Sequence, residues 1–203
     1  MKRKLVALGI ASIAAILLFA VTVTPALHAI SKPEITKIPF VGMSMVYYAN
    51  TNFNYDSFKM GNFLCRPVVV LKYYPETNSV LIRDENSWML VYVENREVYW
   101  ATGWMEQWVP FTVEYWIPTN VKIGSHVNTG GLDAVVTGSK VLSVEGKSVD
   151  CWQLYAAGTG WQDTWYYEKR TGLWIAASWV QWDEDGTLLN SWGGHLASTN
   201  VAL

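Results

Sequence analysis

Residues 161–182 have the sequence WQDTWYYEKRTGLWIAASWVQW. The stretch contains two runs rich in aromatic and apolar residues, 161–167 and 173–182, with the charged segment EKRTG between them. Gly172 supplies the backbone freedom that a tight turn needs, and the charged residues before it solvate the tip of the turn. The stretch therefore predicts a β-hairpin, and the fold can be worked out from the strands around it.

The same pattern recurs along the chain, at residues 68–83, 88–100, 135–157 and 173–189. In each case two runs with high strand propensity flank a short segment of turn-forming residues, such as Glu145-Gly146 or Asp183-Glu184-Asp185-Gly186. Hairpins in close succession are typical of an antiparallel meander. We therefore expect a mainly β protein.

The remaining segments carry weaker signals. A first strand is expected over Met43–Tyr48, followed by a loop over Asn50–Asn62, which is rich in Asn, Asp and Gly. Residues 118–131 contain one proline and three glycines, so they are expected to form a loop with a short strand near Val121.

The N-terminus has the features of an export segment. Three basic residues at positions 2–4 precede an apolar run from Leu5 to Val23, and small residues follow Pro25. This order is typical of a secretory signal, although the run is close to the ~20 residues that span a bilayer. We expect residues 1–29 to be a signal peptide or an N-terminal membrane anchor helix. Either alternative places the rest of the chain outside the cytoplasm, secreted or attached to the membrane.

The composition of the remainder limits domains and partners. Residues 30–42 are expected to be a linker and residues 43–203 a single β domain. Removing the three basic residues of 1–29 from the 15 Lys and Arg leaves 12 against 17 Asp and Glu, a net charge of −5. Nucleic acid is therefore not an expected partner, because it requires a basic face.

Two cysteines, Cys65 and Cys151, leave two alternatives. Export would allow a disulfide between them, and otherwise they are two buried apolar thiols. The sequence has no cysteine and histidine spacing typical of zinc sites, so we expect neither a metal nor another cofactor.

Five motifs in the second half of the chain occur in a fixed order: IPTNVKIG (117–124), VLSVEG (141–146), CWQL (151–154), WYYEKRTGLW (165–174) and LASTN (196–200). Over residues 117–200 the chain resembles uncharacterised exported proteins, mostly archaeal, and the wider lipoprotein-carrier-like superfamily. The resemblance implies a curved antiparallel sheet, an open or incomplete barrel around an apolar cavity. The high tryptophan content departs from the bacterial carriers, so lipoprotein transport itself is not implied.

All twelve tryptophans fall between Trp88 and Trp192. A tryptophan side chain buries about 150–250 Å² and carries one N–H that needs a partner. In the run 161–167 the two-residue period of a strand places four side chains on one face: Trp161, Asp163, Trp165 and Tyr167. That face is either a sheet core that contains one acid or a concave binding face.

A second aromatic group consists of Trp100, Trp104 and Trp108, which are spaced four residues apart. The spacing indicates a short helical turn or an irregular aromatic loop, because Gly103 and Pro110 disfavour a longer helix. Packing within the fold is the alternative to ligand binding for both groups. The candidate ligand-binding residues are Trp100, Trp104, Trp108, Trp161, Asp163, Trp165 and Tyr167.

These features favour an exported, non-catalytic protein that binds an apolar or amphipathic, lipid-like ligand in the concave face of a half-barrel. The alternative is a cell-surface interaction or assembly protein whose Trp-rich loops contact a protein or a glycan. A hydrolase, the third hypothesis, would need His126 or His195 beside a nucleophile. The sequence has no nucleophile-elbow motif, so catalytic activity is not expected.

Overall fold

The computed structural model describes residues 37–53 and 64–203. These residues form twelve β-strands and one short 3₁₀ helix, η1, at Gly103–Trp108. The strands are β1 (Ser44–Phe53), β2 (Leu64–Tyr74), β3 (Ser79–Asp84), β4 (Ser87–Tyr92), β5 (Glu97–Ala101), β6 (Phe111–Thr112), β7 (His126–Thr129), β8 (Leu132–Val144), β9 (Lys147–Gly158), β10 (Trp161–Glu168), β11 (Trp174–Trp182) and β12 (Leu188–Thr199).

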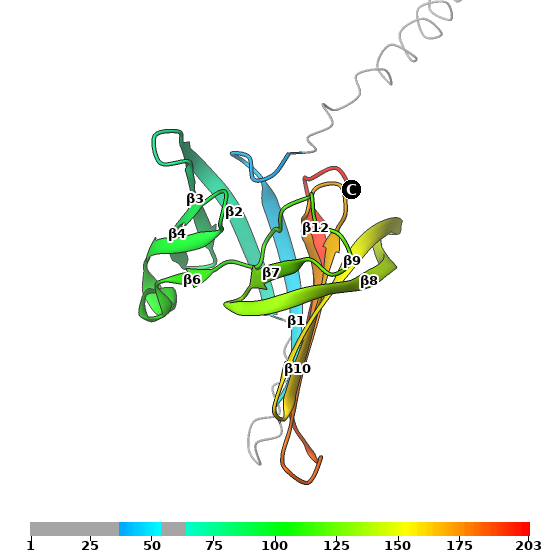
Figure 1. Ribbon diagram of the computed structural model, residues 1–203. Helices are drawn as coiled ribbons and strands as arrows, with labels where there is room; N and C mark the ends of the chain where they lie inside the picture. Colours follow the sequence, from blue (N-terminus) through cyan, green and yellow to red (C-terminus); the bar gives the residue numbers. More distant parts are fainter. Residues whose placement is uncertain (1–36, 54–63) are drawn as a thin grey trace, which may run out of the picture. The chain divides into compact units, whose positions relative to one another are not determined.

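All twelve strands belong to one antiparallel sheet in the order β6-β5-β4-β3-β2-β1-β12-β11-β10-β9-β8-β7. Each half of the chain forms a meander, and the first and last strands join the two halves (Figure 1). The pairing of β1 with β12 runs from Met45↔Thr199 to Phe53↔Asn190. Strands β6 and β7 are the two edges, so the sheet opens at the middle of the chain. The expected mainly β, antiparallel, incomplete barrel is confirmed.

Residues 113–117, which we call the linking segment, follow β6 and contact both halves of the sheet. The amide of Val113 donates to the Arg96 carbonyl, 3.0 Å away, at the β4–β5 turn. The amide of Ile117 donates to the Gly172 carbonyl at 2.9 Å, beside β11. A Cβ at position 172 would lie 2.1 Å from the Ile117 oxygen, so this close approach requires glycine. The linking segment therefore connects the two halves near the open side.

The turns follow the predicted chemistry. Glu145 and Gly146, between β8 and β9, have φ values of +49° and +77°, as in the hairpin turns that suit the twist of strands. At the β11–β12 turn the Asp183 carboxylate accepts hydrogen bonds from the amides of Asp185 and Thr187, at 3.0 and 2.7 Å. These acidic residues therefore serve the turn, as the sequence indicates.

The alternation predicted for residues 161–167 is confirmed over 162–167, while Trp161 at the start of the strand is half-buried like Gln162. Asp163, Trp165 and Tyr167 are buried on the inner face of β10, whereas Gln162, Thr164 and Tyr166 of the other face keep partial exposure. The largest fully buried side chains of the core are Trp165, Tyr167, Met43, Met45, Ile82, Met89, Ile117, Leu154, Leu173 and Ile175.

Two local expectations are wrong. Strand β1 continues to Phe53, beyond Tyr48, because β12 supplies a backbone ladder for residues with low strand propensity. The strand expected near Val121 lies instead at His126–Thr129, where β8 pairs with it from His126↔Val135 to Thr129↔Leu132. In both cases pairing with a partner strand, the distant β12 for β1 and the adjacent β8 for β7, decides where the strand lies.

The expected signal peptide or anchor at residues 1–29 lies outside the described residues, as does most of the linker at 30–42. Within residues 37–53 and 64–203, no helix has the length and apolar character needed to cross a membrane. Cys151 is a buried free thiol, which contradicts a bridge to Cys65. In the sheet order four strands separate β2, which contains Cys65, from β9, which contains Cys151.

Candidate ligand-binding site

A cavity of about 280 Å³ lies between η1, the linking segment and the strands β11 and β12. We call it the apolar cavity, because most of its lining is aromatic or aliphatic. Its aromatic walls are Trp104, Trp108, Phe111, Trp174 and Trp192. Two charged side chains, Arg66 and Glu114, also line it. Two of the three tryptophans in the second predicted group are thus brought together at a cavity.

The outer part of the apolar cavity is formed by η1. Met105 is buried and attaches this short helix to the core, while Trp104 and Trp108 on either side are 52% and 60% exposed. The guanidinium carbon of Arg66 lies 5.7 Å from the ring centre of Trp104, within the range of a cation–π contact. These contacts place two large aromatic rings between the cavity and the solvent.

The inner wall is a stack of three aromatic rings. Trp174 is stacked with Tyr47 at 4.3 Å between ring centres, and with Trp192 at 6.3 Å and an interplanar angle of 12°. The Tyr47 hydroxyl donates to the Trp174 carbonyl at 3.2 Å. Such pairs each contribute about 0.5–1.5 kcal/mol beyond their buried area, so this wall is well fixed.

A partly buried ion pair, formed by Arg66 of the cavity lining and the buried Asp84, lies at the cavity. The Arg66 guanidinium donates through Nε to Asp84 Oδ1 at 2.7 Å, and through Nη2 to Oδ2. The Tyr115 hydroxyl also donates to Asp84 and accepts from Arg66 at 3.3 Å. Burial acts to lower the pKa of Arg66, but Tyr115 and Asp84 outweigh it and raise that pKa above its ordinary value. Arg66 is therefore a permanent cation that is already paired.

Glu114 of the linking segment is different, because no ion-pair partner of it occurs among the described side chains. Its carboxylate lies against the backbone of Gly130, where an added Cβ would be 2.3 Å from Oε1. Burial raises the pKa of Glu114, while the charge of Arg66 and the indole N–H of Trp165 act in the opposite direction. On balance the pKa is raised, because no ion pair compensates the cost of burying the charged carboxylate.

Asp163 is a second interior acid. Burial, followed by the charge of Glu114, raises the pKa of Asp163 to about 8. Its Oδ1 is buried and has no hydrogen-bond partner. Asp163 is therefore largely protonated at neutral pH.

The other candidate residues lie elsewhere. Asp163, Trp165 and Tyr167 share a buried face, and the Trp161 ring packs beside Gly158, but none of these four lines the apolar cavity. Trp100 is exposed on β5, outside the cavity lining. Ligand contact by these five residues stays a prediction.

The sequence alone did not indicate that Glu114, Trp174 and Trp192 would line the same cavity. A signal for Glu114 was present, because it is the sole charged residue of the apolar run FTVEYWI at 111–117. Nothing local could place the two tryptophans beside it, since they come from strands β11 and β12.

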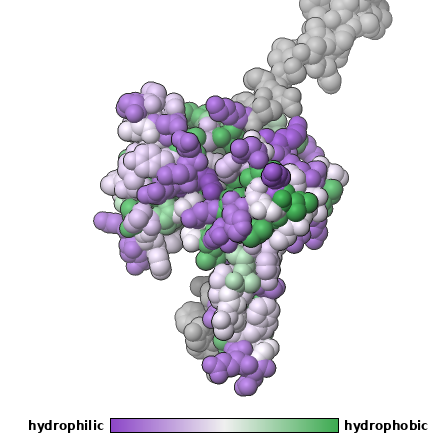
Figure 2. Space-filling view, in the orientation of Figure 1, coloured by the Kyte–Doolittle hydropathy of each residue, from purple (hydrophilic) through white to green (hydrophobic). Residues whose placement is uncertain are grey.

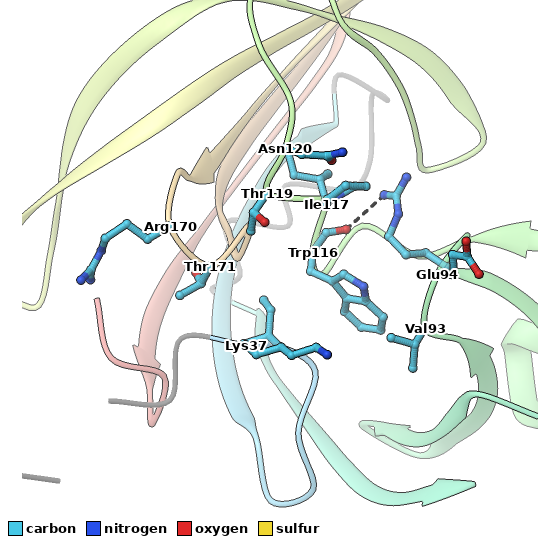
Figure 3. A pocket seen from close by; sticks show the side chains of 12 residues that line it. Lys37, Val93, Glu94, Trp116, Ile117, Thr119, Asn120, Arg170 and Thr171 are labelled. Carbon is cyan, nitrogen blue, oxygen red and sulfur yellow. Dashed lines mark hydrogen bonds between the residues drawn. The ribbon is translucent and has the colours of Figure 1, made fainter. Parts of the chain in front are cut away.

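A larger cavity, of about 500 Å³, lies on the other part of the linking segment and is bordered by charged residues from turns, among them Lys37, Glu94 and Arg170 (Figure 3). Arg96 in its wall donates through Nη1 to the Trp116 carbonyl at 3.1 Å and through Nη2 to the Asn128 carbonyl, while its buried Nε has no hydrogen-bond partner among the described residues. The apolar cavity is the better candidate, because ligand pockets are mostly apolar with few polar groups.

The histidines lie on exposed strand surfaces. His126 on β7 pairs with Asp133 of β8 at 2.9 Å, and both side chains are exposed. His195 on β12 is exposed, and its ring meets Tyr48 edge-on at 6.0 Å between centres. Neither histidine lines the two cavities described above. Among residues 37–53 and 64–203, no three His, Cys, Asp or Glu side chains form a group that could hold a metal ion.

No protein-family model matches the chain, and no curated protein matches it. One solved structure to which the chain is similar is the hypothetical lipoprotein YmcC from Escherichia coli, with 13% sequence identity. The match covers 79% of this chain and 89% of that one, with a TM-score of 0.35. The function must therefore be argued from the geometry and chemistry of the site.

Proposed function

We propose that the protein binds a small apolar or amphipathic ligand in the apolar cavity and catalyses no reaction. The observation that supports this most directly is the aromatic lining of the cavity, with Trp104 and Trp108 at its outer part and the Trp174–Trp192 stack inside. Concave, mainly apolar sites with a few polar groups are the usual form of small-molecule pockets.

The volume limits the size of the ligand. About 280 Å³ lies just below the roughly 300–1,000 Å³ of typical ligand pockets. The cavity therefore suits a small amphiphile or a single chain or head group of a larger lipid. A whole two-chain lipid would leave most of its surface outside.

Fluorescence titration of the full chain with N-phenyl-1-naphthylamine, a neutral apolar probe, tests the proposal. We expect saturable binding that Trp108→Ala weakens at least fivefold, because this ring forms the outer wall. Trp100→Ala is the matched control, since Trp100 is also an exposed tryptophan but lies outside the lining. Absence of saturable binding, or equal losses in both variants, would count against the cavity as a binding site.

A second candidate function rests on the exposed tryptophans. Trp88 and Trp100 lie on the outer face of β4 and β5 and are 41% and 45% exposed, and Trp104 and Trp108 follow on η1. We call these four residues the Trp surface. Figure 2 shows one face of the molecule, on which polar side chains cover much of the surface and smaller hydrophobic groups lie between them. The exposed tryptophans of the Trp surface support a contact with a cell-surface protein or glycan.

The two candidate functions make different demands on Trp88 and Trp100. A double Trp88→Ala, Trp100→Ala variant should keep its affinity for the apolar probe if the cavity is the functional site. Loss of attachment to the surface of the native cell in this variant, with unchanged probe binding, would favour the second function.

We also propose that the domain works outside the cytoplasm, because residues 1–29 have the pattern of an export segment. The mass of the protein isolated from its native cells shows whether residues 1–29 are cleaved as a signal peptide or retained as an anchor. Cleavage predicts a mass that lacks about the first 29 residues. An intact chain in the membrane fraction indicates an anchor, and an intact chain in the cytosol would contradict export.

A further inference from the structure

The most unusual group in the apolar cavity is the carboxylate of Glu114. It lines the cavity, it retains some accessible surface, and the described side chains include no ion-pair partner for it. The nearest cation that influences it, Arg66, is held by both oxygens of Asp84. Arg66 acts on Glu114 only at a distance, since its donors are taken by Asp84, so Glu114 has no cation of its own.

An uncompensated buried charge is costly, and proteins normally pair it or protonate it. A bound cation would supply the missing partner. The aromatic walls also favour a positively charged ligand, because the faces of tryptophan rings attract cations through their quadrupole. One cation–π contact is already present here, between Arg66 and Trp104. The ring faces and the carboxylate of Glu114 both disfavour an anion.

We propose that the apolar cavity recognises an organic cation, the alkylammonium head of a small amphiphile, with Glu114 as its counter-ion and the tryptophan rings as its wall. This inference rests on the proposed function and adds the chemical class of the ligand. The cavity of about 280 Å³ has room for a substituted ammonium group with a short alkyl chain. An ammonium with methyl or alkyl substituents suits aromatic walls better than a hydrated metal ion does.

Calorimetric titration of the full chain with three probes of equal chain length tests the head group: hexyltrimethylammonium, 1-hexanol and hexanoate. The ammonium and the alcohol carry the same hexyl chain, and hexanoate has the same six carbons with one of them in its carboxylate. Their short chains keep all three free of micelles. We expect the ammonium to bind at least tenfold more tightly than the alcohol, and hexanoate to bind most weakly.

The Glu114→Gln variant removes the charge and keeps the shape of the side chain. We expect the preference for hexyltrimethylammonium over hexanol to fall below threefold, with the affinity for hexanol retained. Glu106→Gln is the matched control, because Glu106 is an exposed acid on η1 outside the lining. The Glu106→Gln variant should keep the full preference for hexyltrimethylammonium over hexanol. If Glu114→Gln does not fold, Glu114→Asp, which keeps the charge, should still prefer the ammonium.

The outcomes separate this inference from the proposed function. If hexanol binds but the wild type shows no preference for the ammonium, or if Glu114→Gln keeps the preference, the inference is wrong and the proposed function stands. If none of the probes, including N-phenyl-1-naphthylamine, binds, both fail.

Discussion

At the scale of single residues, the interior acids are the features with the clearest chemical consequence. Asp163 faces the core with one carboxyl oxygen unpartnered, and its pKa is raised to about 8 by burial and by Glu114. The ordinary pKa of an aspartate is about 3.9, which applies to the unfolded chain. Between these two values the folded chain keeps a proton that the unfolded chain has lost. Asp163 therefore makes the fold less stable as the pH rises from about 4 to 8.

Asp163→Asn should remove this dependence. We expect the free energy of unfolding of the wild type to fall from pH 5 to pH 8 by at least about 1.4 kcal/mol more than that of the variant, the equivalent of one pKa unit. Urea unfolding at the two pH values measures this difference. Asp185→Asn, in an exposed turn, is the control and should follow the wild type. Identical pH profiles for Asp163→Asn and the wild type would show that Asp163 is not protonated in the fold.

Gly130 and Gly131 form the β7–β8 turn and give a matched pair for the position of Glu114. Both have positive φ, +58° and +80°, so alanine at either costs about 1–2 kcal/mol of backbone strain. A Cβ at Gly130 would meet the Glu114 carboxylate at 2.3 Å, whereas a Cβ at Gly131 has no neighbour within 4 Å. We expect Gly130→Ala to weaken the binding of hexyltrimethylammonium, measured by calorimetric titration, at least threefold more than Gly131→Ala does. Equal effects would show that the Glu114 position does not matter for binding.

At the scale of elements, the hairpins could be predicted and the linking segment could not. Alternating runs and turn glycines define β8 to β12, since each of these strands pairs with its neighbour in sequence. The amides of Val113 and Ile117 in the linking segment instead donate to the carbonyls of Arg96 and Gly172, which are not their neighbours in sequence. For the same reason the spacing of Trp104 and Trp108 indicated an aromatic turn, but not which strands would complete the cavity.

The attachment of η1 gives a prediction at this scale. Met105 is the buried residue of this helix and also lines the apolar cavity. Met105→Ala should lower the free energy of unfolding by about 2–3 kcal/mol, because it leaves a void where η1 meets the core. It should also weaken binding of N-phenyl-1-naphthylamine. Glu106→Ala, one residue further along and exposed, should change neither quantity. A Met105→Ala variant with wild-type stability would show that η1 is held by other contacts.

At the scale of the whole domain, the pairing of β1 with β12 holds the two halves of the sheet together. Asn200 fastens this junction, because its side chain accepts from the Ser44 amide at 2.9 Å and donates to the Gly42 carbonyl at 2.8 Å. No local pattern in the sequence indicates this pairing. It depends on which edges remain free after the hairpins have formed.

Asn200→Ala should therefore loosen the junction more than the hairpins. We expect a loss of about 1–2 kcal/mol in the free energy of unfolding, with faster amide hydrogen exchange in β1 and β12. The β8–β9 hairpin is the internal control, and its exchange should change only by the overall loss of stability. Uniform acceleration across all strands would contradict a local role for Asn200.

The same junction determines the order in which the chain can fold. Ser44 and Asn200 are 156 residues apart, so β1 is synthesised long before its partner β12. Contacts between such distant segments slow folding, whereas the hairpins of the second half can form as soon as they emerge. Until β12 is complete, β1 presents one unpaired edge that can associate with other chains. A chain that lacks β12 would keep this unpaired edge of β1, and we expect it to aggregate.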